Sequence, residues 1–584
     1  MDNVLEKILG EMSVENMFRH IGVLSGEIGE RLTGSEEICR AAEYIETQLK
    51  EAGIEAHIDR FPLYHSNPGE AQLKVLSPET VTIDTRPVCH ISSTSPAGIE
   101  GELLYVGSGG YEDYRGVDAE NKILLTDICH GPLRPEKARI AWEMGAKALI
   151  IMNWGKPEDN VIQMGGVKTQ WGNPDPDSFK EVTQITVISV SRASGEYLRD
   201  LCLKGSVRVW LKAASTREWL LSNQVVGRLH GGESNGQFVL IGGHLDAWGK
   251  SAVCNSSGNA MTMELARTFA KYRAELKRDI VFTFWDGHEV GECAGSTWYC
   301  DNNWDDLTNN CVAYVNIDGL ANKGTTVPGM TGVPELRKLF IDTAEKVWKS
   351  PGVWRDSFRA EEGATFYGAG VPSAAFMSEY DEETLKELNY TFNGPWLHTN
   401  DDTIDKIDKE LYARHFEYFS HVLYQLANRD ILPYDVESIA EDVMRRFGEL
   451  GEIAGESAAI IESLRPLVDD YHDAAKAIQR MADESSGRDV RNINKALIKW
   501  TRETSAFRNI KDRYKQDSFG LILAESPFPA LCEAVSNMNA HPKGSHDYNL
   551  WLTKAVRERN RVSDALNDSV QYAEILLNMP STES

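Results

Sequence analysis

The sequence lacks the features that mark membrane-spanning, secreted or nucleic-acid-binding proteins. It has no run of 18 consecutive apolar residues, so we expect no membrane span. Its N-terminus has neither the basic start nor the apolar run of a secretory signal. Basic residues are few, because 61 Lys and Arg stand against 88 Asp and Glu and give a net charge of −27. Such a chain is a poor partner for a phosphate backbone, and we expect no nucleic-acid ligand.

Cysteine is scarce and shows no pairing pattern. The chain has nine cysteines, an odd number, and no Cys-x-x-Cys. This usage is typical of free thiols in a reducing compartment, so we expect a cytoplasmic protein. We expect Cys293, Cys300 and Cys311 to be buried apolar thiols.

The length and the succession of patterns indicate three parts. A chain of 584 residues is too long for one compact core. Residues 1–90 and 216–430 alternate helices with buried strands, which favours a mainly parallel sheet covered by helices. Residues 91–215 show strand, helix and strand again, and residues 431–584 show long amphipathic helices. We therefore predict an α/β core, an inserted α/β domain and a C-terminal helical domain.

Side chains that can bind metals follow the predicted strands of the core. The carboxyl ends of strands in an open α/β sheet face the crevice where ligands bind. The candidates are therefore expected to converge at one sheet edge, although they lie far apart in the sequence. They are His244, Asp246, Cys254, His288, Glu289, Asp318 and His398.

In this order the motifs resemble the co-catalytic zinc exopeptidases of the aminopeptidase and glutamate carboxypeptidase type. That family reads Gly-Gly-His-x-Asp, Asp-Asn or Asp-Asp shortly before Ser-Gly, Glu-Glu, Asp, and His-Thr-x-x-Asp-Thr. The resemblance implies that His244 and Asp318 hold one metal ion, and that Glu289 and His398 hold the other. It also implies that Asp246 orients His244 from behind.

The chain departs from the family pattern at two positions. Cys254 stands where the family has the carboxylate that bridges both metals. A thiolate also binds zinc, but it offers one donor atom where a carboxylate has two. We therefore expect one or two ions of zinc or another divalent transition metal, and a single ion could be held by His244, Cys254 and Asp318 or by Cys254, Glu289 and His398.

The second departure is His288, which stands where the family has its general-base Glu. A neutral imidazole can accept a proton or become an extra metal ligand, and both roles are open. Near the expected pocket, Arg359-Ala-Glu361-Glu362 replaces the family's Ser-Asp pair, so the pocket chemistry is expected to differ.

The resemblance extends beyond the metal motifs. The segment 91–215 resembles the family's protease-associated domain, which covers the active site. The C-terminal helices correspond to a dimerisation domain, which implies a homodimer. The polar loop 540–548 between these helices either lies in solvent or reaches a pocket.

Three functions fit these observations. The default is metal-dependent hydrolysis of an amide or peptide bond in a small substrate. Elimination with His288 as the base is the first alternative, and an inert binding protein like transferrin receptor is the second. A metal-free dyad of Cys254 and His288 is disfavoured, because Glu289 and Asp318 make the pocket acidic unless a cation fills it.

Overall fold

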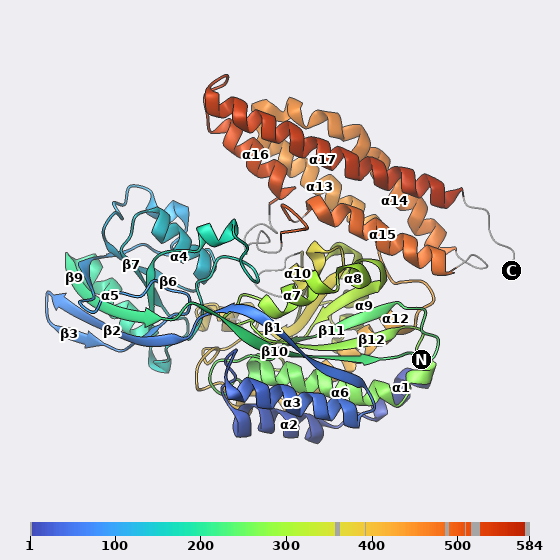
Figure 1. Ribbon diagram of the computed structural model, residues 1–584, viewed down its shortest axis with the longest axis horizontal. Coiled ribbons are helices and arrows are strands. Elements are labelled where there is room, and N and C mark those ends of the chain that lie inside the picture. The colour runs from blue at the N-terminus through green and yellow to red at the C-terminus, as the bar shows by residue number, and fades with distance from the viewer. Residues whose placement is uncertain are drawn as a thin grey trace.

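Two eight-stranded sheets and a C-terminal group of helices make up the protein (Figure 1). The computed structural model describes residues 3–356, 362–391, 393–484, 490–508, 510–515 and 526–578. Among these residues, no helix has both the length and the apolar character that crossing a bilayer requires. The mixture of sheets and helices confirms the predicted α/β fold class.

The first sheet forms the core and carries the predicted metal motifs. Its strands lie in the order β1 (Glu55–His65), β10 (Glu218–Leu229), β12 (Asp279–Trp285), β11 (Phe238–His244), β13 (Cys311–Asn316), β16 (Ser373–Glu379), β14 (Val327–Gly332) and β15 (Val353–Arg355). Strands β12, β11, β13 and β16 run parallel to one another, whereas β10 and β14 on either side of them run antiparallel. The three central strands are buried along their whole length, as continuous apolar runs require.

Helices cover both faces of this sheet (Figure 1). On one face lie α3 (Glu36–Glu51) and α6 (Gly258–Ala270), and on the other lie α7 (Ala294–Asn302) and α8 (Trp304–Asn310). Helix α3 begins at Glu36, because the Ser35 side chain accepts a hydrogen bond from the backbone of Ile38. With both faces covered, the carboxyl edge of the strands is the place left for a ligand.

The second sheet lies between β1 and β10 in the sequence and stands beside the core (Figure 1). Its order is β3 (Val81–Ile83), β2 (Pro68–Ser77), β9 (Val207–Ser215), β5 (Ile99–Tyr105), β6 (Ile123–Asp127), β7 (Ala148–Met152), β8 (Thr186–Val190) and β4 (Thr85–Pro87). It therefore includes residues 68–87, which the sequence analysis had assigned to the core. An alternating strand pattern does not reveal which sheet a strand joins. We call residues 68–215 the insert domain.

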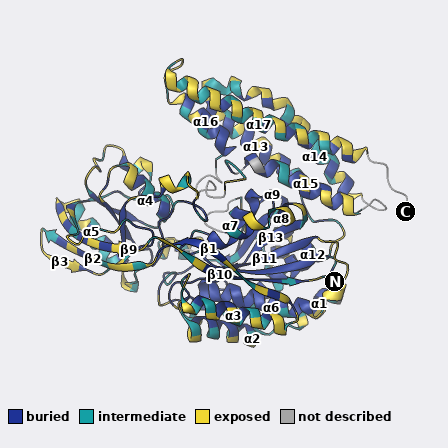
Figure 2. Ribbon diagram, in the orientation of Figure 1, coloured by how far each residue is buried: buried dark blue, intermediate teal, exposed yellow. Residues whose placement is uncertain are grey.

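Among the described residues, the C-terminal helical domain has five α-helices: α13 (Val436–Ala454), α14 (Arg465–Asp483), α15 (Val490–Arg508), α16 (Pro529–Asn539) and α17 (His546–Leu577). Their buried faces point toward one another (Figure 2). Two short 3-10 turns precede helix α14. Helix α17 begins at His546, because the Ser545 side chain caps it.

The early start of α17 shortens the loop expected at 540–548. Only residues up to Ser545 are outside the helix, and they are exposed or half-buried. This part of the loop therefore lies at the surface, and none of its residues lines the pocket beside Trp248. Arg508 connects the helical domain to the core, because its buried guanidinium lies 3.3 Å from the Glu335 carboxylate.

A buried histidine of the core makes stability depend on pH. His415, on α12 (Lys409–Asn428), is fully buried, and burial together with the Arg414 cation lowers its pKa to about 3. In the unfolded chain its pKa returns to about 6.5. The unfolded state then binds the extra proton, so stability is complete above about pH 6.5 and is lost as the pH falls.

We expect His415 to reduce the free energy of unfolding by about 2 kcal/mol between roughly pH 7.5 and pH 5. Urea unfolding at the two pH values measures this. The His415→Gln variant is the control, because it lacks the titrating group. Equal pH dependence of the two proteins would contradict the assignment.

Candidate metal centre

The structure brings five candidate ligands together at the carboxyl edge of the core sheet. His244 is the last residue of β11, and Asp318 lies two residues beyond β13. The His244 Nε2 atom lies 3.5 Å from Asp318 Oδ1 and 3.6 Å from Cys254 Sγ. The other ring nitrogen, Nδ1, lies 2.8 Å from the Asp246 backbone oxygen. That contact leaves Nε2 directed at the other two side chains.

A second pair of side chains, Glu289 and His398, lies beside His244, Asp318 and Cys254. The Nε2 atom of His398 lies 3.2 Å from Oε1 of Glu289. The other oxygen of Glu289, Oε2, accepts a hydrogen bond of 3.1 Å from the buried Trp248 indole. One ligand atom each of His244, Cys254 and Glu289 lies within 4.8 Å of the others, so the two pairs form one cluster.

The distances between ligand atoms in the cluster match the distances between two ligands of one tetrahedral zinc ion. Zinc bonds of about 2.0–2.1 Å to nitrogen, 2.1 Å to oxygen and 2.3 Å to sulfur place tetrahedral ligands about 3.4 Å (nitrogen to oxygen) and about 3.6 Å (nitrogen to sulfur) apart. In addition, Asp318 Oδ1 and Glu289 Oε1 are buried and have no hydrogen-bond partner among the described residues. Buried acceptors of this kind need a cation, and these residues fit one.

Charge in the cluster also favours a cation. Burial, and then the carboxylates of Asp318 and Glu289, raise the pKa of the Cys254 thiol well above its ordinary value. A thiolate forms here only when a positive charge stands beside it. Burial alone would raise the pKa of Glu289, but the imidazole of His398 lowers it to about 2. Glu289 is therefore an anionic ligand over the whole physiological range.

The cluster is open on one side. His244, Cys254 and Glu289 are buried, whereas the side chains of Asp318 and His398 are 16% and 17% exposed. A catalytic metal site keeps a coordination position open to substrate, while a structural one is closed. Partial exposure of two of the five ligands is typical of a catalytic metal site.

Asp246 contacts His244 through its backbone oxygen and, at a longer distance, through its carboxylate. Its carboxylate lies 3.7 Å from His244 Nδ1, and the backbone oxygen of the same residue is the nearer acceptor. The carboxylate instead accepts backbone hydrogen bonds from His288 (3.1 Å) and Glu289 (2.9 Å). Asp246 therefore holds the loop after β12 against the end of β11. Burial raises the pKa of this carboxyl to about 7.

Asp402 places Cys254 in the cluster. Its carboxylate accepts hydrogen bonds from the backbone of Val253 (2.8 Å) and Cys254 (3.1 Å). Burial raises the pKa of Asp402 to about 7. The two motifs that contribute Cys254 and His398 are thus joined by this one side chain.

His288 lies beside the cluster and has partners that the sequence did not indicate. Its ring stacks on that of His244, with centroids 4.2 Å apart. Its Nδ1 lies 2.6 Å from Oε1 of Glu362 and 3.4 Å from Sγ of Cys293. Cys293 is buried as expected, but it contacts a site residue. Burial lowers the pKa of His288, and the Glu362 carboxylate more than offsets this and raises it well above its ordinary value.

Only one signal in the sequence pointed to Glu362. It belongs to the stretch that replaces the family's Ser-Asp pair, of which Arg359 and Glu361 lie outside the described residues. No local pattern could pair it with His288, because 74 residues separate them.

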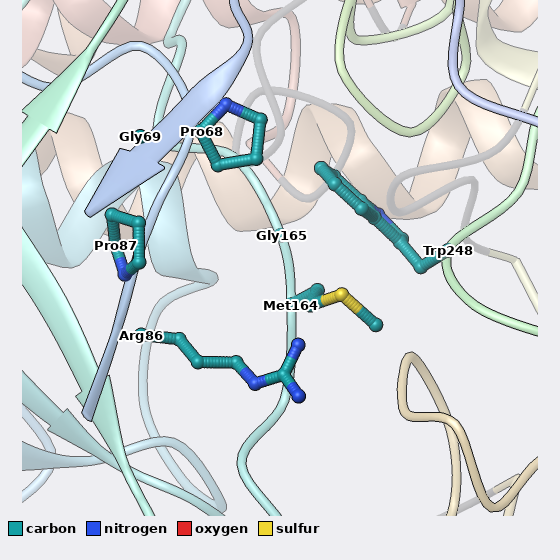
Figure 3. Close-up of a pocket in the computed structure, with 7 residues that line it drawn as sticks. All are labelled: Pro68, Gly69, Arg86, Pro87, Met164, Gly165 and Trp248. Carbon is teal, nitrogen blue, oxygen red and sulfur yellow. The ribbon is translucent and has the colours of Figure 1, made fainter. Parts of the chain in front are cut away.

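A pocket of about 200 Å³ adjoins the second pair (Figure 3). Trp248 lines it, and this is the residue whose indole donates to Glu289. Met164 lines it too, and its backbone N–H donates to the His398 carbonyl at 2.9 Å. The remaining lining residues come from the insert domain: Pro68, Gly69, Arg86, Pro87 and Gly165. The insert domain therefore forms one wall beside the candidate metal centre.

Comparisons with known proteins agree with this geometry. Residues 224–423 match the model of peptidase family M28. A probable glutamate carboxypeptidase of Zea mays is 24% identical over 74% of this chain and 69% of its own length. An inactive zinc metalloprotease of Schizosaccharomyces pombe is 27% identical over 44% of this chain. The chain spans only 33% of that relative's length.

Among solved structures, a zinc aminopeptidase from Bacillus subtilis has the same fold over 72% of this chain and 96% of its own. The TM-score is 0.54 and the identity is 22%. The segment matched by the family model, 224–423, contains every candidate ligand named above. The family match, the curated relative and the solved structure together confirm the predicted resemblance to the co-catalytic zinc exopeptidases.

Proposed function

We propose that this protein is a metal-dependent hydrolase that cleaves an amide or peptide bond of a small substrate. One observation carries the proposal: five side chains with ligand atoms lie together, and the three distances between His244 and Asp318, His244 and Cys254, and His398 and Glu289 are those expected around tetrahedral zinc. The names of the relatives support it, since they include a glutamate carboxypeptidase and a zinc aminopeptidase.

Zinc is the favoured metal, in one or two ions per chain. His244, Cys254 and Asp318 would hold one ion, and Glu289 and His398 would hold a second or complete the first shell. A bound ion of this kind polarises a carbonyl oxygen and lowers the pKa of a water molecule toward neutrality. Asp246 and Asp402 keep the loops that carry these ligands in place.

His288 is the proposed proton-transfer residue. It is the position where the family has its general base, and its ring lies against that of His244. It would accept a proton from the attacking water and pass it to the leaving amine nitrogen. A metal cation beside His244 would lower the raised pKa of His288, since like charges disfavour the protonated imidazole.

Substrate access and assembly are part of the same proposal. The pocket at Trp248 and Met164 lies where a non-reacting part of a small substrate would fit.

A homodimer through the helical domain is proposed, since Leu550 and Ile575 are exposed on α17. A cytoplasmic location is proposed from the nine free cysteines.

A substrate panel tests the function. Aminoacyl amides, dipeptides and N-acylated amino acids are incubated with the purified protein, and the release of free amine is measured. We expect release that stops on chelation and returns when zinc is added. Metal-loaded protein that releases nothing would instead support the inert alternative. An unsaturated product that takes up no labelled oxygen from heavy-oxygen water would support elimination.

A further inference from the structure

The ring of His288 is held by a residue outside all the recognised motifs. Glu362 precedes α10 (Gly363–Gly368), and its Oε1 lies 2.6 Å from Nδ1 of His288. Its side chain is fully buried, and its second oxygen has no hydrogen-bond partner in the part of the chain that the structure describes. Among the described residues, the imidazole of His288 is therefore the hydrogen-bond partner of the Glu362 carboxylate.

This contact determines which ring nitrogen carries the proton. A carboxylate only accepts hydrogen bonds, so the short contact requires the proton on Nδ1. In a neutral imidazole the other nitrogen, Nε2, then has the free lone pair. A ring nitrogen of His288 lies within 4.8 Å of ligand atoms on His244 and Asp318. With Nδ1 bound to Glu362, Nε2 is the ring nitrogen of His288 that is left to take a proton.

A metal ion between His288, Cys293 and Glu362 is the competing explanation, because their ligand atoms also lie within 4.8 Å of one another. The distances decide against it. Nitrogen and oxygen ligands of one tetrahedral zinc ion lie about 3.4 Å apart. The pairs of the candidate centre lie 3.5 and 3.2 Å apart, whereas Nδ1 and Oε1 here are 2.6 Å apart. That is the length of a charge-assisted hydrogen bond.

We propose that Glu362 is a positioning residue, which acts by holding His288 with its proton on Nδ1; this rests on the proposed function. During hydrolysis, Nε2 takes one proton from water as the water oxygen bonds to the carbonyl carbon. Glu362 stabilises the resulting imidazolium. The same proton then moves to the amine nitrogen as the carbon–nitrogen bond breaks, and neutral His288 is restored.

Two variants test the role of Glu362. Glu362→Ala removes the acceptor and is expected to lower kcat by about 10–100-fold, the usual cost of losing such an orienting partner, with KM and metal content unchanged. Glu362→Gln keeps an acceptor oxygen and is expected to recover most of kcat. Glu335→Gln, at a buried carboxylate paired with Arg508, is the matched control and is expected to change only stability. If Glu362→Ala does not fold, Glu362→Gln and Glu362→Asp carry the comparison.

A second readout does not depend on the reaction. NMR of protein carrying isotope-labelled histidine reports which nitrogen of His288 is protonated, with His288→Gln as the assignment control. We expect a proton on Nδ1 in the native protein and a mixture of tautomers in Glu362→Ala. Native tautomer and native kcat in both Glu362 variants would overturn the proposal. Loss of a metal equivalent in Glu362→Gln would make Glu362 a ligand and would overturn it as well.

Discussion

Replacing His244 by alanine is expected to remove bound metal and to lower kcat/KM at least about 1000-fold. Losing a residue that merely orients a ligand already costs about 10–100-fold in metal affinity or activity, and His244 is itself a proposed ligand. Its Nε2 faces both Asp318 and Cys254, so its loss leaves a carboxylate and a thiol without the third donor. Elemental analysis and steady-state kinetics of the purified variant measure both effects.

The matched control for this experiment is His57→Ala. His57 lies on β1, and 61% of its side chain is exposed, so its removal is expected to leave metal content and activity unchanged. Full metal content with undiminished activity in His244→Ala would place the metal, and the reaction, somewhere else.

Restoring the family pattern with the pair Cys254→Asp and His288→Glu is expected to lower the native activity at least about 100-fold. The reason is Glu362, whose carboxylate lies 2.6 Å from the His288 ring. A carboxylate at position 288 would face it in a buried site. Two negative charges about 3 Å apart repel by about 5 kcal/mol at an effective dielectric constant of 20. One of them must then take up a proton or move away.

A third substitution distinguishes this explanation from general damage. Adding Glu362→Gln to the pair removes the repulsion and is expected to recover activity by about 10-fold or more. Hydrolysis of the substrate panel by the double and triple variants is the measurement. If the double variant is as active as the native protein, Cys254 and His288 are interchangeable with the family residues. If the triple variant is no better than the double variant, Glu362 does not oppose the change.

The fold and most of the site could be predicted from the sequence, because the relevant signals are local. Buried strands β11, β12 and β13 are short apolar runs, and each has a residue with metal affinity at its end or within four residues after it. The parallel arrangement then places these residues at one edge. His244, Glu289 and Asp318 were named on this basis, Cys254 and His398 from motifs that resemble the family, and these side chains lie together in the structure.

The remaining features depend on contacts between distant segments. Nothing near Glu362 in the sequence indicates His288, and nothing near Asp402 indicates the backbone of Cys254. The sequence also does not indicate that the Asp246 carboxylate accepts two backbone hydrogen bonds from the loop after β12. The residues of β2, β3 and β4 do not indicate which sheet these strands join, and only their partners assign them to the insert domain.

The most direct test is the metal content of the purified protein, measured together with its activity before and after chelation. We predict one or two equivalents of zinc or another divalent transition metal per chain, loss of amide hydrolysis when the metal is removed, and recovery when it is restored. Protein that contains no transition metal and keeps its full activity in the presence of chelator would contradict the proposed metal centre.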